Sequence, residues 1–250
     1  MKNIVVLLSL VSFAVGAQPT ESPKYKPSVL IEFFTSEGCS SCAETDAFAQ
    51  EIKAISDSND LMVYTLDWHV DLWDKSGWKD PFSDSTYSIR QHNMALKNKQ
   101  QAIFTPMAFV NGKGALPAGA KKDIGAMIER AATQPSSHFL LFSASWFANE
   151  KQLTMEYEIK GKPDSLDVVF VLVEKEIHNF VAAGENKGKT LVHHNVARKV
   201  EVNTRQSAFG TSFFKFATSE VDFSRYRIIA FLQHRRTMEI KACQMLNFKQ

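Results

Sequence analysis

Two cysteines separated by two residues carry the most specific chemical signal in the chain. Cys39 and Cys42 follow an apolar run at residues 29–34 and precede a helical pattern. This spacing lets the two sulfur atoms join, and the free N–H groups and dipole of a helix start favour a thiolate over a thiol. The pattern predicts redox chemistry or the binding of a soft metal ion.

The third cysteine and a structural alternative also have to be weighed. In an oxidising compartment a CxxC pair can persist as a disulfide that only clips the structure together. Its two-residue spacer closes too short a loop to gain much stability from chain entropy, which weakens this alternative. Cys243 lies in the last apolar segment, and we expect a buried free thiol there because free cysteines are usually buried.

The first residues resemble an export signal. Lys2 precedes an apolar run at residues 4–15, and small residues follow it. This pattern predicts a secretory signal peptide at residues 1–17, a linker at 18–27 and a periplasmic or secreted protein. No later stretch approaches the roughly 20 apolar residues that a membrane span requires, so we expect none.

Composition excludes few classes but argues against nucleic-acid binding. The 250 residues include 44% hydrophobic and 22% charged residues, as in an ordinary globular protein. With 29 basic and 27 acidic residues the net charge is only +2. A field this weak gives no reason to expect a nucleic-acid partner.

The element pattern of residues 28–134 predicts a thioredoxin-like α/β domain. We expect strands at 29–34, 61–66 and 107–110, the last followed by a turn at Asn111-Gly112 and a paired strand. Helical spacing of apolar residues indicates helices at 41–56, 83–99 and 121–132. Strand, helix, strand, helix, strand pair, helix is a thioredoxin-like order, and the first two strands pair most simply in parallel.

Residues 135–250 have a different sequence pattern, rich in strand-like segments, which predicts an all-β, sandwich-like domain. Apolar and polar residues alternate along residues 153–160, the period of a half-exposed strand. Short strands separated by turn residues are typical of a β-sandwich. Further strands are expected at residues 139–147, 166–174, 190–203, 225–234 and 239–248.

The Thr105-Pro106 pair opens the third strand of the first half. In thioredoxin-like folds a cis-proline loop lies against the CxxC and shapes the surface that meets a substrate. We therefore predict a cis bond here, although only about 5% of X–Pro bonds are cis. The alternative is a trans proline that begins an edge strand.

An aromatic segment begins where the second strand should end. Residues 67–80 hold three of the four tryptophans, and Trp68 and Trp73 are candidates for the wall of a substrate groove. The rings can equally cover the end of the sheet. His69 is a candidate for setting a thiol's protonation state or completing a metal site, the alternative being a locally hydrogen-bonded histidine.

Four segments together resemble a family of exported bacterial thioredoxin-like proteins catalogued as a domain of unknown function. They are residues 30–42 (LIEFFTSEGCSSC), residues 67–81 (DWHVDLWDKSGWKDP), Arg90-Gln91 and residues 104–112 (FTPMAFVNG). The likeness continues weakly through Gly184-Glu185-Asn186, Leu191, His193 and Val196. It implies a thioredoxin-like fold with a CxxC, without a settled activity. The chain departs from the family pattern at Ala43-Glu44, Phe104 and Met107.

The second half contains no recognisable cofactor motif. Residues 183–189 form a polar loop that lacks the first glycine of a phosphate-binding motif. His193 and His194 are neighbours on a strand and should face opposite sides, so one ion can hardly use both. We expect no bound cofactor, and interpret this region as structural or partner-binding.

Three functional hypotheses follow. The leading one is thiol–disulfide exchange with a protein or small-molecule thiol or disulfide. In it Cys39 is exposed at the helix start, half-buried Cys42 resolves the mixed disulfide, and Thr105-Pro106, His69, Trp68 and Trp73 form the groove. The second is a Cu(I)- or zinc-binding protein that uses Cys39, Cys42 and His69. The third is a non-enzymatic interaction protein in which the CxxC is a structural disulfide.

Overall fold

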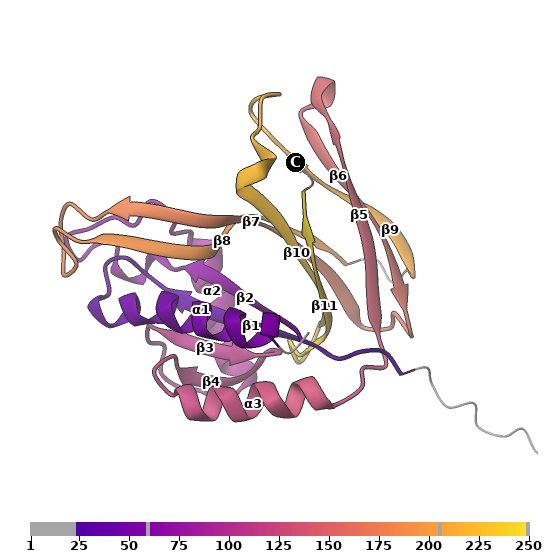
Figure 1. Ribbon diagram of the computed structural model, residues 1–250, viewed down its shortest axis with the longest axis horizontal. Coiled ribbons are helices and arrows are strands. Elements are labelled where there is room, and N and C mark those ends of the chain that lie inside the picture. The colour runs from indigo at the N-terminus through magenta and orange to yellow at the C-terminus, as the bar shows by residue number, and fades with distance from the viewer. Residues whose placement is uncertain (1–23, 59–60, 205–206, 249–250) are drawn as a thin grey trace, which may run out of the picture.

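The computed structural model describes residues 24–58, 61–204 and 207–248 (Figure 1). The expected signal peptide and most of the linker lie outside these residues. The described helices are α1 (Ala43–Ser58), α2 (Ser85–Lys97) and α3 (Lys121–Thr133). The strands are β1 (Ser28–Thr35), β2 (Met62–His69), β3 (Met107–Val110), β4 (Lys113–Pro117), β5 (Phe139–Phe147), β6 (Gln152–Lys160), β7 (Leu166–Phe180), β8 (Thr190–Asn203), β9 (Phe209–Lys215), β10 (Tyr226–His234) and β11 (Ile240–Asn247).

Most strands belong to one large mixed sheet. Its order is β11-β10-β7-β8-β2-β1-β3-β4, and β5-β6-β9 form a second, antiparallel sheet. In the first half β1 pairs in parallel with β2 and antiparallel with β3, and β3 pairs antiparallel with β4. The predicted mixed α/β class and the parallel pairing of the first two strands are confirmed.

Strand β1 is buried along its whole length because helices cover both faces of the sheet there. Val29, Ile31 and Phe33 pack with α1 and α3, whereas Leu30 and Phe34 pack with α2. A strand buried on both faces reads as a continuous apolar run, which is the pattern of residues 29–34. This packing fixes the end of β1, from which the CxxC turn projects.

The strand-rich second half shares the large sheet with the first half. Strands β7 and β8 form a long antiparallel hairpin, and β8 pairs in parallel with β2 at Asp67 and Val196. The sheet therefore continues across residue 134, where the sequence suggested a domain boundary. Farther along the chain, the smaller sheet packs on β7 and β10 through a separate apolar core that includes Met155, Tyr157 and Phe170.

The long β7–β8 hairpin also reaches the end of the first half at which the CxxC turn follows β1. The tip of β7–β8 extends away from the smaller sheet and lies along the helical part of the molecule (Figure 1). Side chains of the second half can thereby touch the loop after β1. No helix among the described residues is long and apolar enough to cross a lipid bilayer.

Candidate functional site

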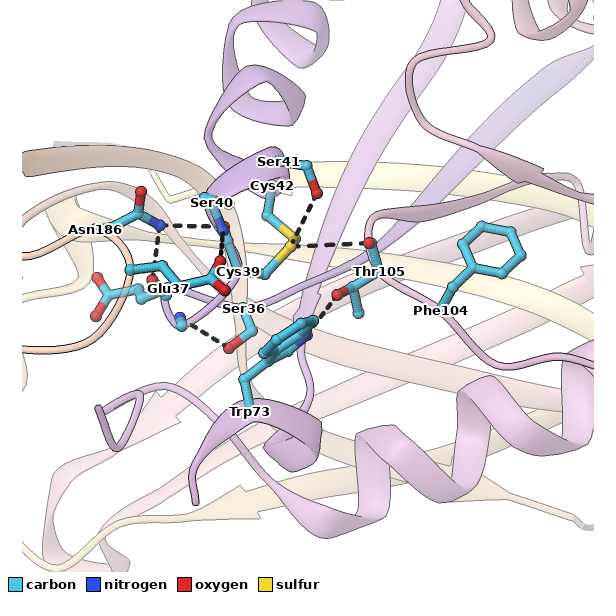
Figure 2. Close-up of a disulfide and its surroundings, with 12 residues drawn as sticks. Ser36, Glu37, Cys39, Ser40, Ser41, Cys42, Trp73, Phe104, Thr105 and Asn186 are labelled. Carbon is cyan, nitrogen blue, oxygen red and sulfur yellow. Dashed lines mark hydrogen bonds between the residues drawn. A yellow bond between two sulfur atoms is a disulfide. The ribbon is translucent and has the colours of Figure 1, made fainter. Parts of the chain in front are cut away.

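The CxxC turn, residues 39–42, joins β1 to α1. Cys39 precedes a short 3-10 turn at Ser40–Cys42, and α1 begins at the next residue. The turn is closed by backbone hydrogen bonds in which Cys39 N–H donates to Ser36 and Cys42 N–H donates to Cys39. Cys39 and Cys42 form a disulfide, with their Cα atoms 5.4 Å apart (Figure 2). The prediction that these sulfurs can join is confirmed.

The Thr105–Pro106 peptide bond is cis, as predicted. Its loop lies against the disulfide, with the Thr105 carbonyl oxygen 3.8 Å from Cys39 Sγ (Figure 2). Gln91 on α2 supports the loop from behind, donating from Nε2 to the Phe104 carbonyl at 2.8 Å. The disulfide and the proline loop therefore meet, although 66 residues separate Cys39 from Thr105.

Both cysteines are covered, so the expectation of an exposed Cys39 and a half-buried Cys42 is wrong. Cys39 is 1% exposed and Cys42 2% exposed, whereas Ser40 and Ser41 between them are exposed. Trp73 provides part of the cover. A methyl group added to Gly38 would lie 2.7 Å from Trp73 Cβ, and the Trp73 indole N–H donates to Thr105 Oγ1 at 2.7 Å.

Two residues expected in a substrate groove are buried elsewhere. Trp68 is 1% exposed, stacks on Phe34 and donates its indole N–H to Glu32 on the α2 side of the sheet. His69 is fully buried, with Nδ1 2.7 Å from Asp80 Oδ2. Burial removes both from any surface groove in this conformation, whereas Trp73, Thr105 and Pro106 are partly exposed.

Beneath the CxxC turn lies a cluster of buried ionisable side chains that the sequence did not reveal. We call it the buried polar cluster; its members are Glu37, Asp46, Asp67, His69, Asp80 and His193, all less than 9% exposed. Five of them come from the first half, and His193 comes from β8. Buried ionisable groups are costly unless they are paired, and they gather at functional sites more often than elsewhere.

His193 is the centre of this cluster. Its Nε2 lies 3.0 Å from Glu37 Oε1 and its Nδ1 lies 3.0 Å from Asp46 Oδ2. Burial alone would lower the pKa of His193, but the hydrogen bonds and charges of Asp46 and Glu37 raise that pKa to about 10. The ring is therefore an imidazolium at neutral pH.

Two carboxyl groups near His193, those of Asp67 and Asp80, have pKa values shifted in opposite directions. Burial, helped by the neighbouring Asp46 charge, raises the pKa of Asp67 well above its ordinary value, although the charge of His193 opposes this. Burial also acts to raise the pKa of Asp80, but the charge and hydrogen bond of His69 hold it below the ordinary value. The pKa values of these two carboxyl groups are thus shifted in opposite directions, so Asp67 keeps its proton to a higher pH than Asp80 does.

The β7–β8 hairpin tip, residues 181–189, forms hydrogen bonds directly with the CxxC turn and the residues just before it. Asn186 is fully buried and donates from Nδ2 to the carbonyl oxygens of Glu37, at 2.9 Å, and Cys39, at 3.1 Å. The Glu185 carboxylate accepts from the Ser40 N–H at 3.0 Å. The sequence predicted a polar loop with a structural or partner-binding role here, but not its contact with the CxxC turn. The weak family likeness at Gly184-Glu185-Asn186 and His193 was the one signal of its role.

A metal site using the same residues is not assembled. The two sulfur atoms are bonded to each other, and His69 Nδ1 is hydrogen-bonded to Asp80. Within residues 24–58, 61–204 and 207–248, no group of three or more His, Cys, Asp or Glu side chains has metal-binding geometry.

Cys243 is free and fully buried, as predicted. Burial raises the pKa of its thiol to about 12. A thiol in this state is a poor nucleophile at neutral pH, because the thiolate is the reactive form. Cys243 therefore belongs to the core under β10 and β11, not to the redox site.

Comparisons with known proteins show the fold and the family. Protein AGR_C_4864 from Agrobacterium tumefaciens, a crystal structure, is 19% identical with a TM-score of 0.64, over 91% of this chain and 97% of that chain. The structure of HBP35 of Porphyromonas gingivalis is 14% identical with a TM-score of 0.65, over 90% of this chain and 76% of that chain. No curated protein matches the chain. The model of the family described as "Protein of unknown function (DUF1223)" matches residues 30–233, and the chain belongs to that family.

Proposed function

We propose that this protein is an exported thiol–disulfide oxidoreductase whose reactive pair is Cys39 and Cys42. The observation that carries the proposal is the contact between the disulfide and the cis-proline loop, with Cys39 Sγ 3.8 Å from the Thr105 carbonyl oxygen. A backbone segment beside the sulfur gives a partner polypeptide a place to pair. The exposed Ser40 and Ser41 put the disulfide next to the surface.

A thioredoxin-like arrangement of the first half supports this function. The strand order β2-β1-β3-β4, with β3 antiparallel to its neighbours, resembles the thioredoxin core. Helices α1 and α3 cover one face and α2 covers the other, and the CxxC stands between β1 and α1. We assign residues 28–134 to this thioredoxin-like unit and residues 135–250 to a sandwich-like unit that shares its sheet.

The exchange itself conserves electrons and protons. A thiolate of an outside dithiol attacks Cys39 Sγ, the Cys39–Cys42 bond breaks, and its electron pair leaves on Cys42 Sγ. The second thiol of the dithiol then attacks the mixed disulfide and releases Cys39 as a thiolate. The partner is oxidised to its disulfide, and the two protons that it gives up are available to the new thiols. The same steps in reverse oxidise a partner.

The closed cover sets a condition on this chemistry. Because Cys39 is 1% exposed, an attacking thiolate reaches its sulfur only when a covering side chain moves. Trp73 is the simplest candidate, since one hydrogen bond to Thr105 and its packing on Gly38 hold it beside the disulfide (Figure 2). We propose that partner binding at the Thr105-Pro106 loop displaces this ring.

The test is turnover of a disulfide substrate. Reduction of a fluorescent peptide disulfide by dithiothreitol is measured with the wild-type protein, Cys39→Ser and the matched control Cys243→Ser. We expect acceleration by the wild type and Cys243→Ser, and none by Cys39→Ser. Equal rates with all three proteins, and with none, would overturn the proposed activity.

Burial favours one rival function, an interaction protein with a structural disulfide. Both cysteines are at most 2% exposed. A structural disulfide should have a reduction potential below about −300 mV, whereas a catalytic one is less negative. Such a low potential together with absent turnover would favour the rival. The cluster of ionisable groups under the turn argues against it, because a clip needs no such cluster.

Export remains part of the proposal. We propose that residues 1–17 form a signal peptide and that the mature protein functions in the periplasm or outside the cell, where a disulfide is stable. Fractionation of cells that produce the full chain, followed by N-terminal sequencing, tests this. An N-terminus near Gln18 in the exported fraction is the expected result, and retention of Met1 in the cytoplasm would contradict it.

A further inference from the structure

His193 connects the two sides of the CxxC turn. Glu37, which it contacts through Nε2, lies two residues before Cys39. Asp46, which it contacts through Nδ1, lies four residues after Cys42, in the first turn of α1. A single imidazole from the second half thus holds both flanks of the disulfide, with both ring nitrogens 3.0 Å from a carboxylate oxygen.

Other contacts of Glu37 carry this connection to the cysteine itself. Asn179 and Trp78 donate to the Glu37 side chain, so the carboxylate is held from several sides. The Glu37 carbonyl oxygen shares the Asn186 amide with the Cys39 carbonyl oxygen. A change at His193 can therefore reach Cys39 through a short chain of hydrogen bonds.

The charges around His193 give its ring an electrostatic role. The ionisable groups that face it are Glu37 from the loop after β1, Asp46 from α1, and Asp67 and His69 from β2, with Asp80 behind His69. Four of these five groups are acidic. Without a cation between them, Glu37 and Asp46 would place uncompensated negative charge beside the start of α1, where a thiolate forms when the disulfide is reduced.

We propose that His193 is a positioning residue of the redox site: it fixes Glu37 and Asp46 around the CxxC turn, and its positive charge favours the reduced couple. This inference deepens the proposed function and rests on it. Reduction breaks the Cys39–Cys42 bond and adds two electrons and two protons from an outside dithiol, which becomes a disulfide. A cation near the site stabilises whatever part of the product is thiolate.

The proposed effect of charge predicts that two substitutions shift the reduction potential in opposite directions. His193→Gln removes the cation and keeps a hydrogen-bonding side chain, so the potential of the couple should become more negative. Asp46→Asn removes a neighbouring negative charge, so the potential should become less negative. A role in packing alone would not give shifts of opposite sign. His194→Gln is the matched control, because His194 is the next residue and its side chain is 20% exposed.

The experiment measures the reduction potential at pH 7 in anaerobic dithiothreitol buffers, with thiols counted by alkylation and mass spectrometry. We expect His193→Gln to shift the equilibrium constant at least tenfold toward the disulfide, about 30 mV for a two-electron couple. Asp46→Asn should shift it the other way, and His194→Gln should match the wild type. The pKa of the Cys39 thiol, from the pH dependence of its alkylation in reduced protein, should rise in His193→Gln.

Several results would overturn the proposal. They are an unchanged potential in a folded His193→Gln, or shifts of the same sign in His193→Gln and Asp46→Asn. If His193→Gln does not fold, Asp46→Asn and the double variant Glu37→Gln/His193→Gln decide, the latter being expected to return toward the wild-type potential. The potential is measurable without turnover. If the reduction potentials shift as expected but the protein reduces no substrate, the proposed activity is contradicted and the role of His193 in setting the potential is supported.

Discussion

The ring of His69 packs edge-on against the ring of His193, with centroids 4.7 Å apart. This contact completes a closed network of polar groups. His193 contacts the Glu37 carboxylate, His69 contacts Asp80, and Asp80 accepts from the Glu37 backbone N–H at 2.8 Å. The network begins and ends at Glu37, which lies two residues before Cys39 of the disulfide. Side chains from β2, β8 and the loop after β1 are thus organised around one residue.

The protonation of His193 in this network, and of the neighbouring Asp67, predicts how the free energy of unfolding depends on pH. The pKa of His193 rises on folding from 6.5 to about 10. Its stabilising contribution is therefore complete below pH 6.5 and is lost as the pH rises toward 10. The pKa of Asp67 is also raised on folding, so its contribution likewise falls with rising pH, starting above its ordinary pKa of 3.8. We expect the free energy of unfolding to fall by a few kcal/mol between pH 6.5 and 9.

Denaturant unfolding of the disulfide-intact protein at several pH values measures this slope. His193→Gln should flatten it, and His194→Gln should keep it. The window ends at pH 9 because Cys243, whose ordinary pKa is 9.0, contributes above it. A slope that is the same in His193→Gln and the wild type would contradict the assignment.

A glycine at the turn between β3 and β4 joins the two halves. Gly112 has φ of +76°, and a methyl group there would lie 2.2 Å from the Met238 carbonyl oxygen in the β10–β11 turn. Gly112→Ala should therefore destabilise the protein by at least about 2 kcal/mol, since a left-handed alanine costs about 1–3 kcal/mol before the clash. Thermal unfolding compares it with Gly119→Ala, where nothing lies within 4 Å. Equal melting temperatures for the two variants would refute the close approach.

Local patterns in the sequence predicted individual elements well. The strand at 107–110 and the strand at 190–203 have the predicted bounds, and the helix at 121–132 ends one residue later, at Thr133. The cis bond before Pro106 and the free Cys243 were also predicted. The element bounds and the buried Cys243 depend on nearby residues or on strong residue preferences, whereas the cis bond was predicted from the place of Thr105-Pro106 in a thioredoxin-like order. The strand β9 was missed, because its exposed Phe209 and Phe213 lie among small polar residues and give no buried-strand pattern.

Long-range pairing is what the sequence did not reveal. The parallel contact of β8 with β2 joins residues 67 and 196, and no local pattern encodes it. That contact brings His193 to Glu37, 156 positions away. The cover over Cys39 was missed for the same reason, since Trp73 and Asn186 reach the CxxC turn from distant segments. The residues with chemistry were identifiable; the partners that restrain them were not.

The buried thiol of Cys243 should not react in the native protein. Burial raises its pKa to about 12, and the side chain is fully buried. We expect no labelling by iodoacetamide at pH 8 under native conditions and one labelled site after unfolding without reductant. Mass spectrometry of the intact protein gives both numbers. Native labelling at Cys243, with Cys243→Ala as the blank, would show that β10 and β11 open more readily than this packing implies.

Trp73 should control how fast the disulfide is reduced. Its Cβ lies against Gly38, and its indole N–H donates to Thr105 Oγ1 beside the disulfide (Figure 2), so Trp73→Ala removes the ring next to the sulfur atoms without altering either cysteine. Because exchange rates depend on access to the attacked sulfur, reduction by dithiothreitol should be about tenfold faster in Trp73→Ala. Trp73→Phe keeps a ring and loses only the hydrogen bond, so its rate should lie between those of the wild type and Trp73→Ala.

The adjacent residue provides the control for this measurement. Leu72 is 52% exposed, so Leu72→Ala removes a side chain from the same short turn without uncovering the disulfide. Rates are followed by quenched-flow alkylation, and the reduction potential is measured in parallel. A faster rate at an unchanged potential identifies a cover rather than a change in disulfide stability. If Trp73→Ala and Leu72→Ala are reduced at the same rate, the opening that admits a partner must involve another segment, and the hairpin tip at Asn186 becomes the one to test.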